Sequence, residues 1–326
     1  QKEGIKMRVG FIGTGRIANR HLEKLIRIKN VELISFCDLI KERAEEVAKK
    51  YGGRAYTDHY KMLDKENLDA VYICLPPFAH TNQEILAAEK GINLFIEKPI
   101  ALNLEKARQI NEVIKKAGII SSVGYVYRYS DIVNRVKEEV GDKKIALLLG
   151  YYLSSMPHPS WWRKKDASGG QIVEQATHIF DLARYFAGEV DKLYAQRSQG
   201  LMSNIENYSV DDASCVSLHF RNGTIGTISS TCLLQRKGRW GINLIGKDIE
   251  INLFLSSHFL RINGEEEGEK IRAARDPYQE ENQAFIEAVK NNDPTPIKSP
   301  YSDALKTLEL TLAANTSLEK GRAVIL

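Results

Sequence analysis

Lys98 is the first residue whose type and position indicate chemistry. It belongs to Glu97-Lys98-Pro99, which directly follows a short apolar run at residues 93–96 that is typical of a buried strand. Ligands bind beyond the carboxyl ends of the strands in parallel sheets, so Lys98 is a candidate acid or proton relay. A solvated lysine at a strand end is the plainer interpretation. Pro99 rigidifies the position and allows a cis Lys98–Pro99 peptide bond.

A second group of ionisable residues lies in a predicted helix at 171–186, which follows Ser168-Gly169-Gly170. Glu174, His178 and Asp181 stand at i, i+4 and i+7, so a single helix would place them along one face. Most other residues of the segment are apolar, and ionisable groups on a buried helix are costly unless they face water, one another or a ligand. The plainer interpretations are a solvent-facing stripe and a hydrogen-bonded core histidine. A metal site would need further clustered ligands, which the sequence does not offer, and we predict none.

A glycine-rich loop near the start of the chain is typical of dinucleotide binding. Gly10-Phe11-Ile12-Gly13-Thr14-Gly15-Arg16-Ile17-Ala18 follows an apolar run and opens a helical pattern. Gly13 permits a tight turn, Gly15 lets the backbone approach a pyrophosphate, and Ala18 allows the helix to pack closely on the strand. Asp38 ends the next predicted strand and is placed to accept hydrogen bonds from the adenosine ribose hydroxyls.

The charge of Asp38 also bears on the choice of cofactor. It would repel a 2′-phosphate, which favours NAD, while Arg16 and Lys41 keep NADP as an alternative. A flavodoxin-like domain with an incidental aspartate is the alternative to dinucleotide binding. The predicted cofactor contacts in this region are Gly13, Thr14, Gly15, Arg16, Ile17 and Asp38.

A second loop, Leu75-Pro76-Pro77-Phe78-Ala79-His80, follows another apolar run. Its prolines form a rigid wall and remove two backbone donors. Since it also leaves the carboxyl end of a predicted strand, we expect it to line the same site. The cofactor contacts predicted from this loop and the lysine motif are Leu75, Pro76, Pro77, His80, Glu97 and Lys98.

The elements that must position these residues change in character near residue 124. Before it, short apolar strands alternate with helical patterns, which predicts an α/β domain over residues 1–124 with a doubly wound parallel sheet. The strands are expected at 7–12, 31–37, 70–75, 93–96 and 119–123, and the helices at 17–28, 41–51, 81–90 and 104–117.

After residue 124, longer alternating strands predict an α+β domain over residues 125–326 with a largely antiparallel sheet. Asn222-Gly223 is a strong hairpin signal between two of these strands. Helices are expected at 131–140, 171–186, 278–290 and 302–320, and strands near 145–154, 191–198, 213–220, 224–234, 240–246, 248–255 and 258–263.

Composition narrows the class of protein. The 326 residues carry a net charge of +4, with both signs spread along the chain, which favours neither nucleic acid nor a membrane surface as a partner. The longest uncharged apolar stretch, at 145–153, is too short to span a bilayer, and residues 1–6 lack the apolar core of a signal peptide. Glutamates 265–267 are interpreted as a solvated hairpin tip. Cys37, Cys74, Cys215 and Cys232 stand singly in strand-like runs, which predicts reduced core thiols and a cytoplasmic protein.

Together these motifs resemble the Gfo/Idh/MocA oxidoreductases, a family named for glucose–fructose oxidoreductase and inositol dehydrogenase. The resemblance covers nearly the whole chain in order. It rests on the glycine loop, the Pro-Pro loop with His80, Glu97-Lys98-Pro99, Gly124 to Arg128, Trp162-Arg163, the helix with Glu174, His178 and Asp181, and a final helix ending at Gly321-Arg322.

The resemblance implies a Rossmann domain joined to an α+β domain with an open, mostly antiparallel sheet. It also implies an NAD-dependent oxidoreductase of sugars, cyclitols or related polyols, and a homodimer or homotetramer formed through the outer face of that sheet. By position, Lys98 would contact the reacting oxygen and His178 would exchange its proton. Glu174 stands where related dehydrogenases often have Asp, and would orient His178 or bind a neighbouring hydroxyl. Asp181 is expected to orient His178 or to have a structural role.

Four further residues are predicted at the rim of the substrate pocket, with packing as the equal alternative for each: Tyr127, Arg128, Trp162 and Arg163. Two other functions remain open on the same fold. One is a catalytically silent sensor of dinucleotide and sugar, which would need neither Lys98 nor His178. The other is a reductase of an imine, a diol or a tetrapyrrole, the last of which would require a broad apolar groove.

Overall fold

The computed structural model describes residues 6–263 and 268–326. The expected hairpin tip at 265–267 and residues 1–5 lie outside this range. The chain forms two compact units, each described by itself. Unit 1 comprises the chain up to Tyr129 together with Asp276–Leu305, and unit 2 comprises Ser130–Arg275 together with Lys306–Leu326.

Unit 1 contains a six-stranded sheet in the order β3-β2-β1-β4-β5-β6. All its strand pairs are parallel, so the predicted doubly wound Rossmann sheet is confirmed. The strands are β1 Met7–Ile12, β2 Val31–Cys37, β3 Arg54–Tyr56, β4 Ala70–Ile73, β5 Asn93–Ile96 and β6 Ser121–Val123. The helices are α1 Arg16–Leu25, α2 Lys41–Tyr51, α3 His59–Lys65, α4 Gln83–Glu89, α5 Leu104–Ala117 and α10 Pro277–Asn291, with short 3₁₀ turns η1 Pro77–Ala79 and η2 Val126–Tyr129.

Strand β3 and helix α3 were not expected from the sequence. Both are short, and β3 is mostly exposed, so neither shows a recognisable spacing of apolar residues in the sequence. One signal was available: the side chain of Asp58 caps α3 by accepting hydrogen bonds from the backbone N–H groups of Tyr60 and Lys61.

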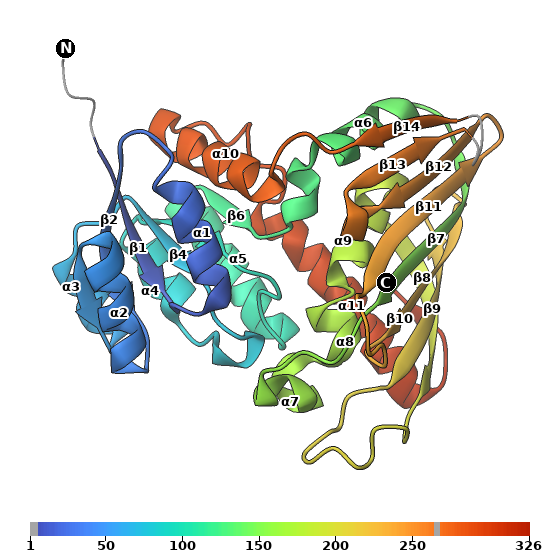
Figure 1. Ribbon diagram of the computed structural model, residues 1–326, viewed down its shortest axis with the longest axis horizontal. Helices are drawn as coiled ribbons and strands as arrows, with labels where there is room; N and C mark the ends of the chain where they lie inside the picture. The colour runs from blue at the N-terminus through green and yellow to red at the C-terminus, as the bar shows by residue number, and fades with distance from the viewer. Residues whose placement is uncertain (1–5, 264–267) are drawn as a thin grey trace. The chain divides into compact units, whose positions relative to one another are not determined.

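Helix α10 belongs to unit 1, although the sequence division at residue 124 assigns it to the second domain. Phe285 of α10 meets the stacked rings of Tyr72 and Phe95 edge-on, at centroid distances of 5.5 Å. Tyr72 also stacks on Phe11 at 4.8 Å, so α10 completes the aromatic core of the Rossmann sheet. Figure 1 shows α10 lying beside α1, with which it packs. An amphipathic pattern specifies a buried face but not the unit that buries it.

Unit 2 contains a nine-stranded sheet in the order β14-β13-β12-β11-β7-β10-β9-β8-β15. Every pair is antiparallel except β7 with β10, which confirms the predicted mostly antiparallel sheet. The strands are β7 Ile145–Leu153, β8 Val190–Ser198, β9 Ala213–Phe220, β10 Ile225–Thr231, β11 Arg239–Gly246, β12 Ile249–Phe254, β13 Phe259–Ile262, β14 Glu269–Arg272 and β15 Val324–Ile325. The other elements are α6 Asp131–Val140, η3 Ser160–Arg163, α7 Lys165–Ser168, α8 Gly170–Glu174, α9 Thr177–Ala187, η4 Leu255–Ser257 and α11 Tyr301–Lys320, whose first turn belongs to unit 1.

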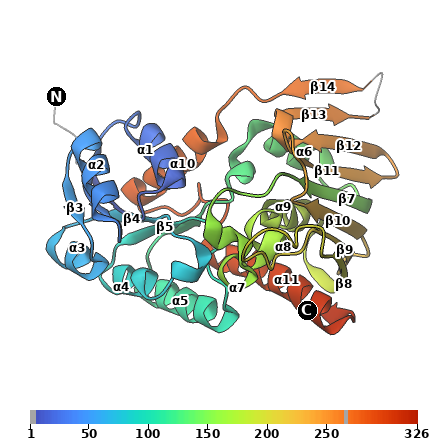
Figure 2. The ribbon, with the colours of Figure 1, turned by 60° about the horizontal axis from the view of Figure 1, so that its bottom comes forward.

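Helices lie against one face of the nine-stranded sheet (Figures 1 and 2). A Cβ atom at Gly150 of β7 would lie 2.6 Å from Ile179 of α9, which shows how closely that helix packs. Side chains of the opposite parity point away from α9. Among these, Leu149 is 36% exposed and Ile225 is 53% exposed. In the described residues this outer face carries no helix.

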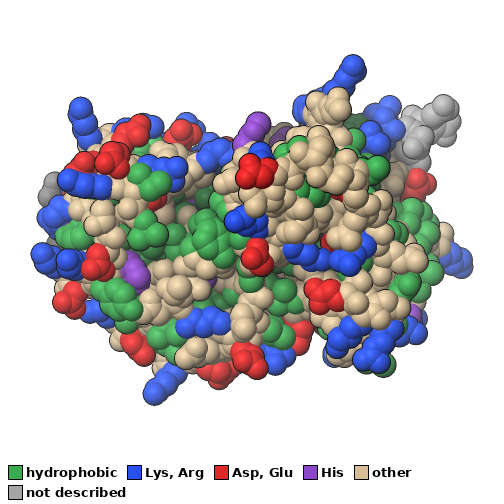
Figure 3. Space-filling view, turned by 90° about the horizontal axis from the view of Figure 1, so that it is seen from below, with side chains coloured by type: hydrophobic (Ala, Val, Ile, Leu, Met, Phe, Trp, Pro, Cys, Tyr) green, Lys and Arg blue, Asp and Glu red, His purple; other side chains and the backbone are tan. Residues whose placement is uncertain are grey.

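The four cysteines are free thiols. Cys37, Cys74 and Cys232 are buried, as predicted, but Cys215 is exposed on the outer face of β9, so the prediction of a core thiol is wrong there. The reason is the alternation of β9, which buries Val216 and turns the preceding side chain outward. Lys and Arg side chains are interspersed with Asp and Glu over the face seen in Figure 3. No helix of the described residues is long and apolar enough to cross a bilayer.

Candidate active site

The glycine loop of unit 1 joins β1 to α1. Gly13 has φ +88°, and a Cβ there would lie 2.4 Å from the carbonyl oxygen of Cys74, so only glycine fits this turn. At Gly15 the surroundings are different, because a Cβ would meet no described atom within 4 Å. No described side chain caps α1, and its first turn, which contains Arg16 and Ile17, carries no acidic residue. Open space beside uncapped N–H groups suits a pyrophosphate.

Asp38 ties the glycine loop to the end of β2. Its Oδ2 accepts hydrogen bonds from the backbone N and the hydroxyl of Thr14, both at 3.0 Å, and its Oδ1 accepts one from the backbone N of Ile40 at 2.9 Å. A carboxylate has about four acceptor positions, so Asp38 retains capacity for ribose hydroxyls. The predicted NAD contacts around Gly13, Thr14, Gly15 and Asp38 are therefore brought together, and their chemistry fits the dinucleotide.

The proline-rich loop has a rigid turn at η1, with Pro77 buried and Leu75 and Pro76 partly exposed. His80 is buried, and its Nδ1 lies 2.5 Å from a carboxylate oxygen of Glu84 in α4. This pairing anchors the end of the loop on α4, which favours a structural role for His80 over direct contact with a cofactor.

Glu97 and Lys98 leave the end of β5, and the Lys98–Pro99 peptide is cis. Lys98 is partly exposed, whereas Glu97 is buried and its Oε1 lies 2.9 Å from Nε2 of His21 in α1. The other oxygen of Glu97 accepts the backbone N–H of Lys98 at 3.1 Å. The carboxylate of Glu97 is thus engaged by the protein, and its contact with the cofactor stays a prediction.

Sequence reasoning missed His21 and its second partner, Asn282 of α10. The ring Nδ1 of His21 lies 2.9 Å from the amide nitrogen and 3.2 Å from the amide oxygen of Asn282. A signal for His21 was present, because it lies on the buried stripe of α1 formed by Ala18, Leu22 and Leu25. A histidine within an apolar stripe needs a polar partner, and neither Glu97 nor Asn282 is close to it in sequence.

The predicted rim residues of unit 1 have different surroundings. Arg128 is 4% exposed, and its guanidinium donates to the carbonyl oxygen of Lys298 at 2.7 Å and lies 2.6 Å from a carboxylate oxygen of Asp303. These contacts favour the packing interpretation for Arg128. Tyr127, by contrast, is partly exposed.

The predicted single helix at 171–186 is wrong: α8 ends at Glu174 and α9 begins at Thr177. The backbone N of Ala176 bonds to the carbonyl of Gln171, five residues back, at 2.8 Å, and this widened turn interrupts the helix. The interruption needs neither Gly nor Pro, so the sequence pattern does not reveal it. Glu174 and His178 therefore stand on consecutive helices rather than on one continuous face.

Two of the three predicted residues of this segment are nonetheless partly exposed. Between Gly170 and Phe180, every residue is buried except Glu174, Gln175 and His178, which are partly exposed. Asp181 is 1% exposed and accepts a hydrogen bond at 3.1 Å from Thr307, whose hydroxyl also accepts one from Arg184. These contacts favour the structural alternative for Asp181.

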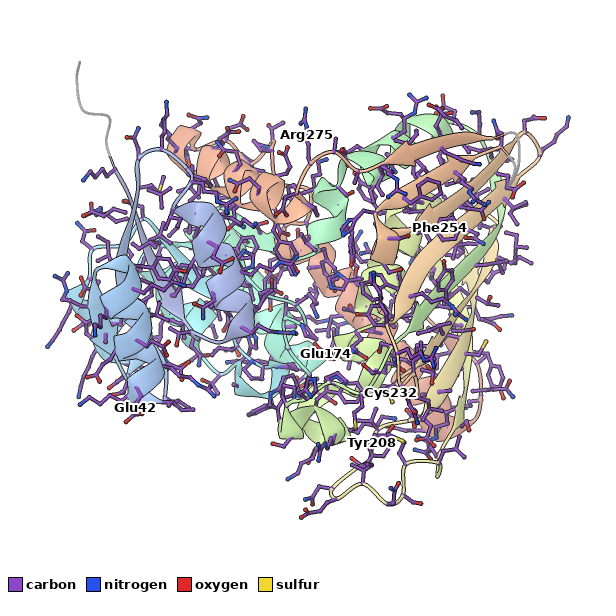
Figure 4. All side chains as sticks on the ribbon, viewed as in Figure 1. Glu42, Glu174, Tyr208, Cys232, Phe254 and Arg275 are labelled. Carbon is purple, nitrogen blue, oxygen red and sulfur yellow. The ribbon has the colours of Figure 1, made fainter. Side chains whose placement is uncertain are left out.

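Trp162 and Glu174 are joined directly. The indole nitrogen of Trp162 in η3 donates to Oε2 of Glu174 at 2.8 Å. The Trp162 ring is 1% exposed and packs against Cys232, whose thiol lies 3.1 Å from the hydroxyl of Tyr208. Glu174, Cys232 and Tyr208 are labelled in Figure 4. Trp162 thus holds the Glu174 carboxylate through its indole N–H, while its neighbour Arg163 is partly exposed.

No group of three or more His, Cys, Asp or Glu side chains within the described ranges is arranged to hold a metal ion. The burial of Cys74 raises the pKa of its thiol well above the usual value, with a smaller contribution from the charge of Glu97. A thiol of that kind is a weak nucleophile at neutral pH. The candidates for acid–base chemistry that the sequence predicted, Lys98, Glu174 and His178, are all partly exposed.

The doubly wound sheet and its glycine loop define a dinucleotide-binding protein. Residues 7–125 match the oxidoreductase family described by its NAD-binding Rossmann fold, and residues 144–252 match the GFO/IDH/MocA C-terminal domain. Myo-inositol 2-dehydrogenase of Thermotoga maritima is 30% identical over 333 residues, covering 98% of each chain. The chain therefore belongs to the GFO/IDH/MocA oxidoreductase family, as its motifs indicated.

Two further relatives extend the likeness over the full chain. The scyllo-inositol 2-dehydrogenase (NAD(+)) of Bacillus subtilis is 28% identical and covers 98% of this chain and 96% of its own. The crystal structure of a probable dehydrogenase from Thermotoga maritima superposes with a TM-score of 0.83 at 28% identity, covering 98% of both chains. The chain is an oxidoreductase of this family with an NAD-binding Rossmann domain.

Proposed function

We propose that this protein is an NAD-dependent dehydrogenase that oxidises a secondary hydroxyl of a cyclitol, a sugar or a related polyol. The observation that carries the proposal is the partial exposure of Glu174 and His178 on a segment whose other residues, Gln175 apart, are buried. Partly exposed ionisable groups in such a setting suit a ligand rather than a core. The names of the two inositol dehydrogenase relatives support a cyclitol as the first substrate to test.

In this proposal unit 1 binds the cofactor. The N–H groups at the start of α1 hold the pyrophosphate, and Asp38 accepts the hydroxyls of the adenosine ribose. When bound, NAD supplies the acceptor for the hydride that leaves the substrate carbon. The negative charge of Asp38 disfavours a 2′-phosphate, so NADH binds more tightly than NADPH.

Lys98 and His178 act on the substrate oxygen. The ammonium of Lys98 stabilises the negative charge that develops on this oxygen as the carbonyl forms. Neutral His178 takes the hydroxyl proton as general base. Glu174, held by the indole of Trp162, accepts a hydrogen bond from a neighbouring hydroxyl or from His178. Tyr127 and Arg163, both partly exposed, complete the polar rim.

The alternatives make different demands on the same residues. A sensor of dinucleotide and sugar has no use for a general base, so the presence of both Lys98 and His178 favours turnover. A reductase of tetrapyrroles needs a broad apolar surface, whereas the candidates here are charged or polar: Lys98, Glu174 and His178.

The test is a substrate panel with both cofactors. Purified protein is supplied with inositols, open-chain polyols and aldoses together with NAD or NADP, and reduced cofactor is followed by absorbance. We expect turnover with at least one cyclic polyol and a higher kcat/KM with NAD. Binding of NADH without turnover of any polyol would instead support the sensor, and a preference for NADP would contradict the role given to Asp38.

We also propose that the outer face of the nine-stranded sheet joins copies of this chain. Leu149, Ile225 and Ile245 are exposed there, beside a groove of about 700 Å³ lined in part by Tyr151 and Phe254. Contiguous apolar side chains on a sheet face are typical of an interface. Ile225→Lys should therefore lower the mass measured by sedimentation equilibrium, while Tyr60→Lys, at an exposed position in unit 1, should not. An unchanged mass for Ile225→Lys, or a monomeric parent, would contradict this proposal.

A further inference from the structure

A buried polar cluster bonds to the backbone of Lys98, and the proposed chemistry does not use it. Its members are His21 of α1, Glu97 at the end of β5 and Asn282 of α10. All three are buried, and the side chains of His21 and Glu97 are at most 6% exposed. We propose that His21 is a positioning residue for Lys98: it holds the Glu97 carboxylate where that carboxylate fixes the backbone from which Lys98 emerges. The inference rests on the proposed function, in which Lys98 acts on the substrate oxygen.

The two oxygens of Glu97 have separate partners. Oε1 lies 2.9 Å from Nε2 of His21, and Oε2 accepts the backbone N–H of Lys98 at 3.1 Å. The second bond fixes the peptide plane between residues 97 and 98, and so the direction in which Lys98 leaves the strand. If the first bond is lost, the carboxylate is free to rotate and the second bond weakens.

Asn282 contacts the other ring nitrogen of His21. Its amide nitrogen and amide oxygen lie 2.9 Å and 3.2 Å from Nδ1 of His21, and the amide nitrogen also donates to the carbonyl oxygen of Tyr278 at 2.7 Å. A carboxylate oxygen only accepts hydrogen bonds, so Nε2 of His21 is the donor to Glu97. The ring is also held between aromatic neighbours, with Phe95 at a centroid distance of 4.8 Å and Tyr278 at 5.8 Å.

Gly124 bounds Glu97 on another side. A Cβ at this position would lie 2.8 Å from the carboxyl carbon of Glu97, closer than Cβ contacts in proteins allow. The backbone N of Gly124 bonds to the carbonyl of Ile96 at 2.9 Å, so the chain is not free to withdraw. The position of the Glu97 carboxylate is therefore set by His21, by the N–H of Lys98 and by the space that Gly124 leaves.

A second buried carboxyl group, Glu281 of α10, lies outside this cluster. Burial, and after it the charge of Glu97, raises the pKa of Glu281 well above its usual value. Neither carboxyl oxygen of Glu281 has a hydrogen-bond partner among the described residues, so Glu281 makes no hydrogen bond that competes with Glu97 for His21.

Three variants separate positioning from general support of the fold. His21→Leu removes the donor to Glu97. His21→Gln is the matched control, because the glutamine amide retains an N–H that reaches the place of Nε2. Gly124→Ala leaves His21 and Glu97 intact but displaces the carboxylate from the other side. Thermal unfolding of each variant reports whether it is folded.

The first readout does not depend on activity. Reductive ¹³C-methylation keeps the charge of lysine side chains, and the Lys98 signal is assigned by its absence in Lys98→Arg. We expect the NMR shift and titration of Lys98 to coincide in the parent and in His21→Gln, and to differ in His21→Leu and in Gly124→Ala. An unchanged Lys98 signal in folded His21→Leu or in Gly124→Ala would overturn the proposal, as would a His21→Gln signal that matches His21→Leu.

The second readout is turnover of the polyol selected by the panel. A displaced Lys98 should lower kcat by about tenfold to a hundredfold, with the NADH affinity unchanged, in His21→Leu and Gly124→Ala but not in His21→Gln. If His21→Leu fails to fold, the Lys98 signal and kcat of Gly124→Ala test the proposal instead. A parent that oxidises no polyol counts against the proposed function alone, because the Lys98 signal still decides whether His21 positions that residue.

Discussion

The glycine loop proposed to hold the cofactor and Glu174, proposed to act with the substrate, are supported in different ways. In unit 1 the backbone itself forms much of the site: Gly13 donates to Cys37, and Thr14 is bound through its backbone N to Asp38. In unit 2 a side chain gives the support, since the indole of Trp162 holds Glu174 at the end of a five-residue helix. Cofactor affinity should therefore depend on backbone shape in unit 1, and turnover on individual side chains.

The largest effect is expected from removing the groups that act on the substrate oxygen. Lys98→Ala and His178→Ala should each lower kcat by about 10²- to 10⁴-fold, because each removes a charge-stabilising or proton-accepting group. NADH affinity, measured by fluorescence titration, should be retained in both. Lys116→Ala, at an exposed position of α5, is the control and should keep the parent rate. Near-parent rates in both variants would remove the catalytic assignment.

Gly13→Ala should weaken the binding of NADH without changing the residues that act on the substrate. The new Cβ would meet the Cys74 carbonyl and force a left-handed conformation on alanine, a strain of about 1–3 kcal/mol. NADH affinity should fall by about tenfold or more if this strain is relieved by moving the loop. Gly52→Ala is a matched control, since Gly52 has φ +82° but open space around it, and it should leave NADH affinity unchanged. Equal NADH affinity in the two variants would argue against the turn as the source of binding.

Trp162→Phe tests the support of Glu174. Phenylalanine keeps most of the ring packing but removes the N–H donated to the carboxylate, a bond of about 1.5–3 kcal/mol. We expect kcat/KM for the polyol to fall by about tenfold while NADH affinity stays the same. The neighbouring Trp161→Phe serves as the control. A loss of NADH affinity in Trp162→Phe, or no change in kcat/KM, would contradict the view that Trp162 supports Glu174 and not the cofactor site.

Glu281→Gln should change stability rather than rate. The folded-state pKa of Glu281 is raised above its usual value of 4.5, so above pH 4.5 the wild-type protein takes up a proton at this site on folding. Its free energy of unfolding should then fall, relative to Glu281→Gln, by about 1.4 kcal/mol per pH unit until the folded-state pKa is passed. Below pH 4.5 the difference between the two proteins should be constant.

Denaturant unfolding at several pH values measures this trend. Glu287→Gln, an exposed change on the same helix, should show no such dependence. A difference between Glu281→Gln and the parent that does not vary with pH would show that Glu281 is ionised in the folded protein.

The sequence predicted best where function needs a local pattern. The spacing of Gly13, Gly15 and Asp38 identified the cofactor loop because a tight turn, a helix N-terminus and a strand end follow one another along the chain. The nine-stranded sheet was predicted as a class, but its strand order was not, since pairing between β7 and β10 depends on segments far apart in sequence. The short elements β3 and α3 fell below the length at which periodicity is visible.

The candidate site was predicted less well where it depends on contacts between residues far apart in the sequence. His21 and Asn282 are separated by 261 positions, and nothing in their local patterns predicts that they meet. The break between α8 and α9 has no glycine or proline to mark it, so the prediction of one helix carrying Glu174, His178 and Asp181 was wrong in its geometry. Both are cases in which tertiary packing overrides local propensity.

The most direct test follows the hydrogen atom itself. The polyol selected by the panel is prepared with deuterium on the carbon that bears the reacting hydroxyl, and the NADH formed by the wild-type protein is examined by mass spectrometry. The account predicts that this deuterium appears in NADH and that turnover slows with the labelled substrate. NADH that carries no deuterium from the polyol would contradict direct transfer between the substrate carbon and the nicotinamide.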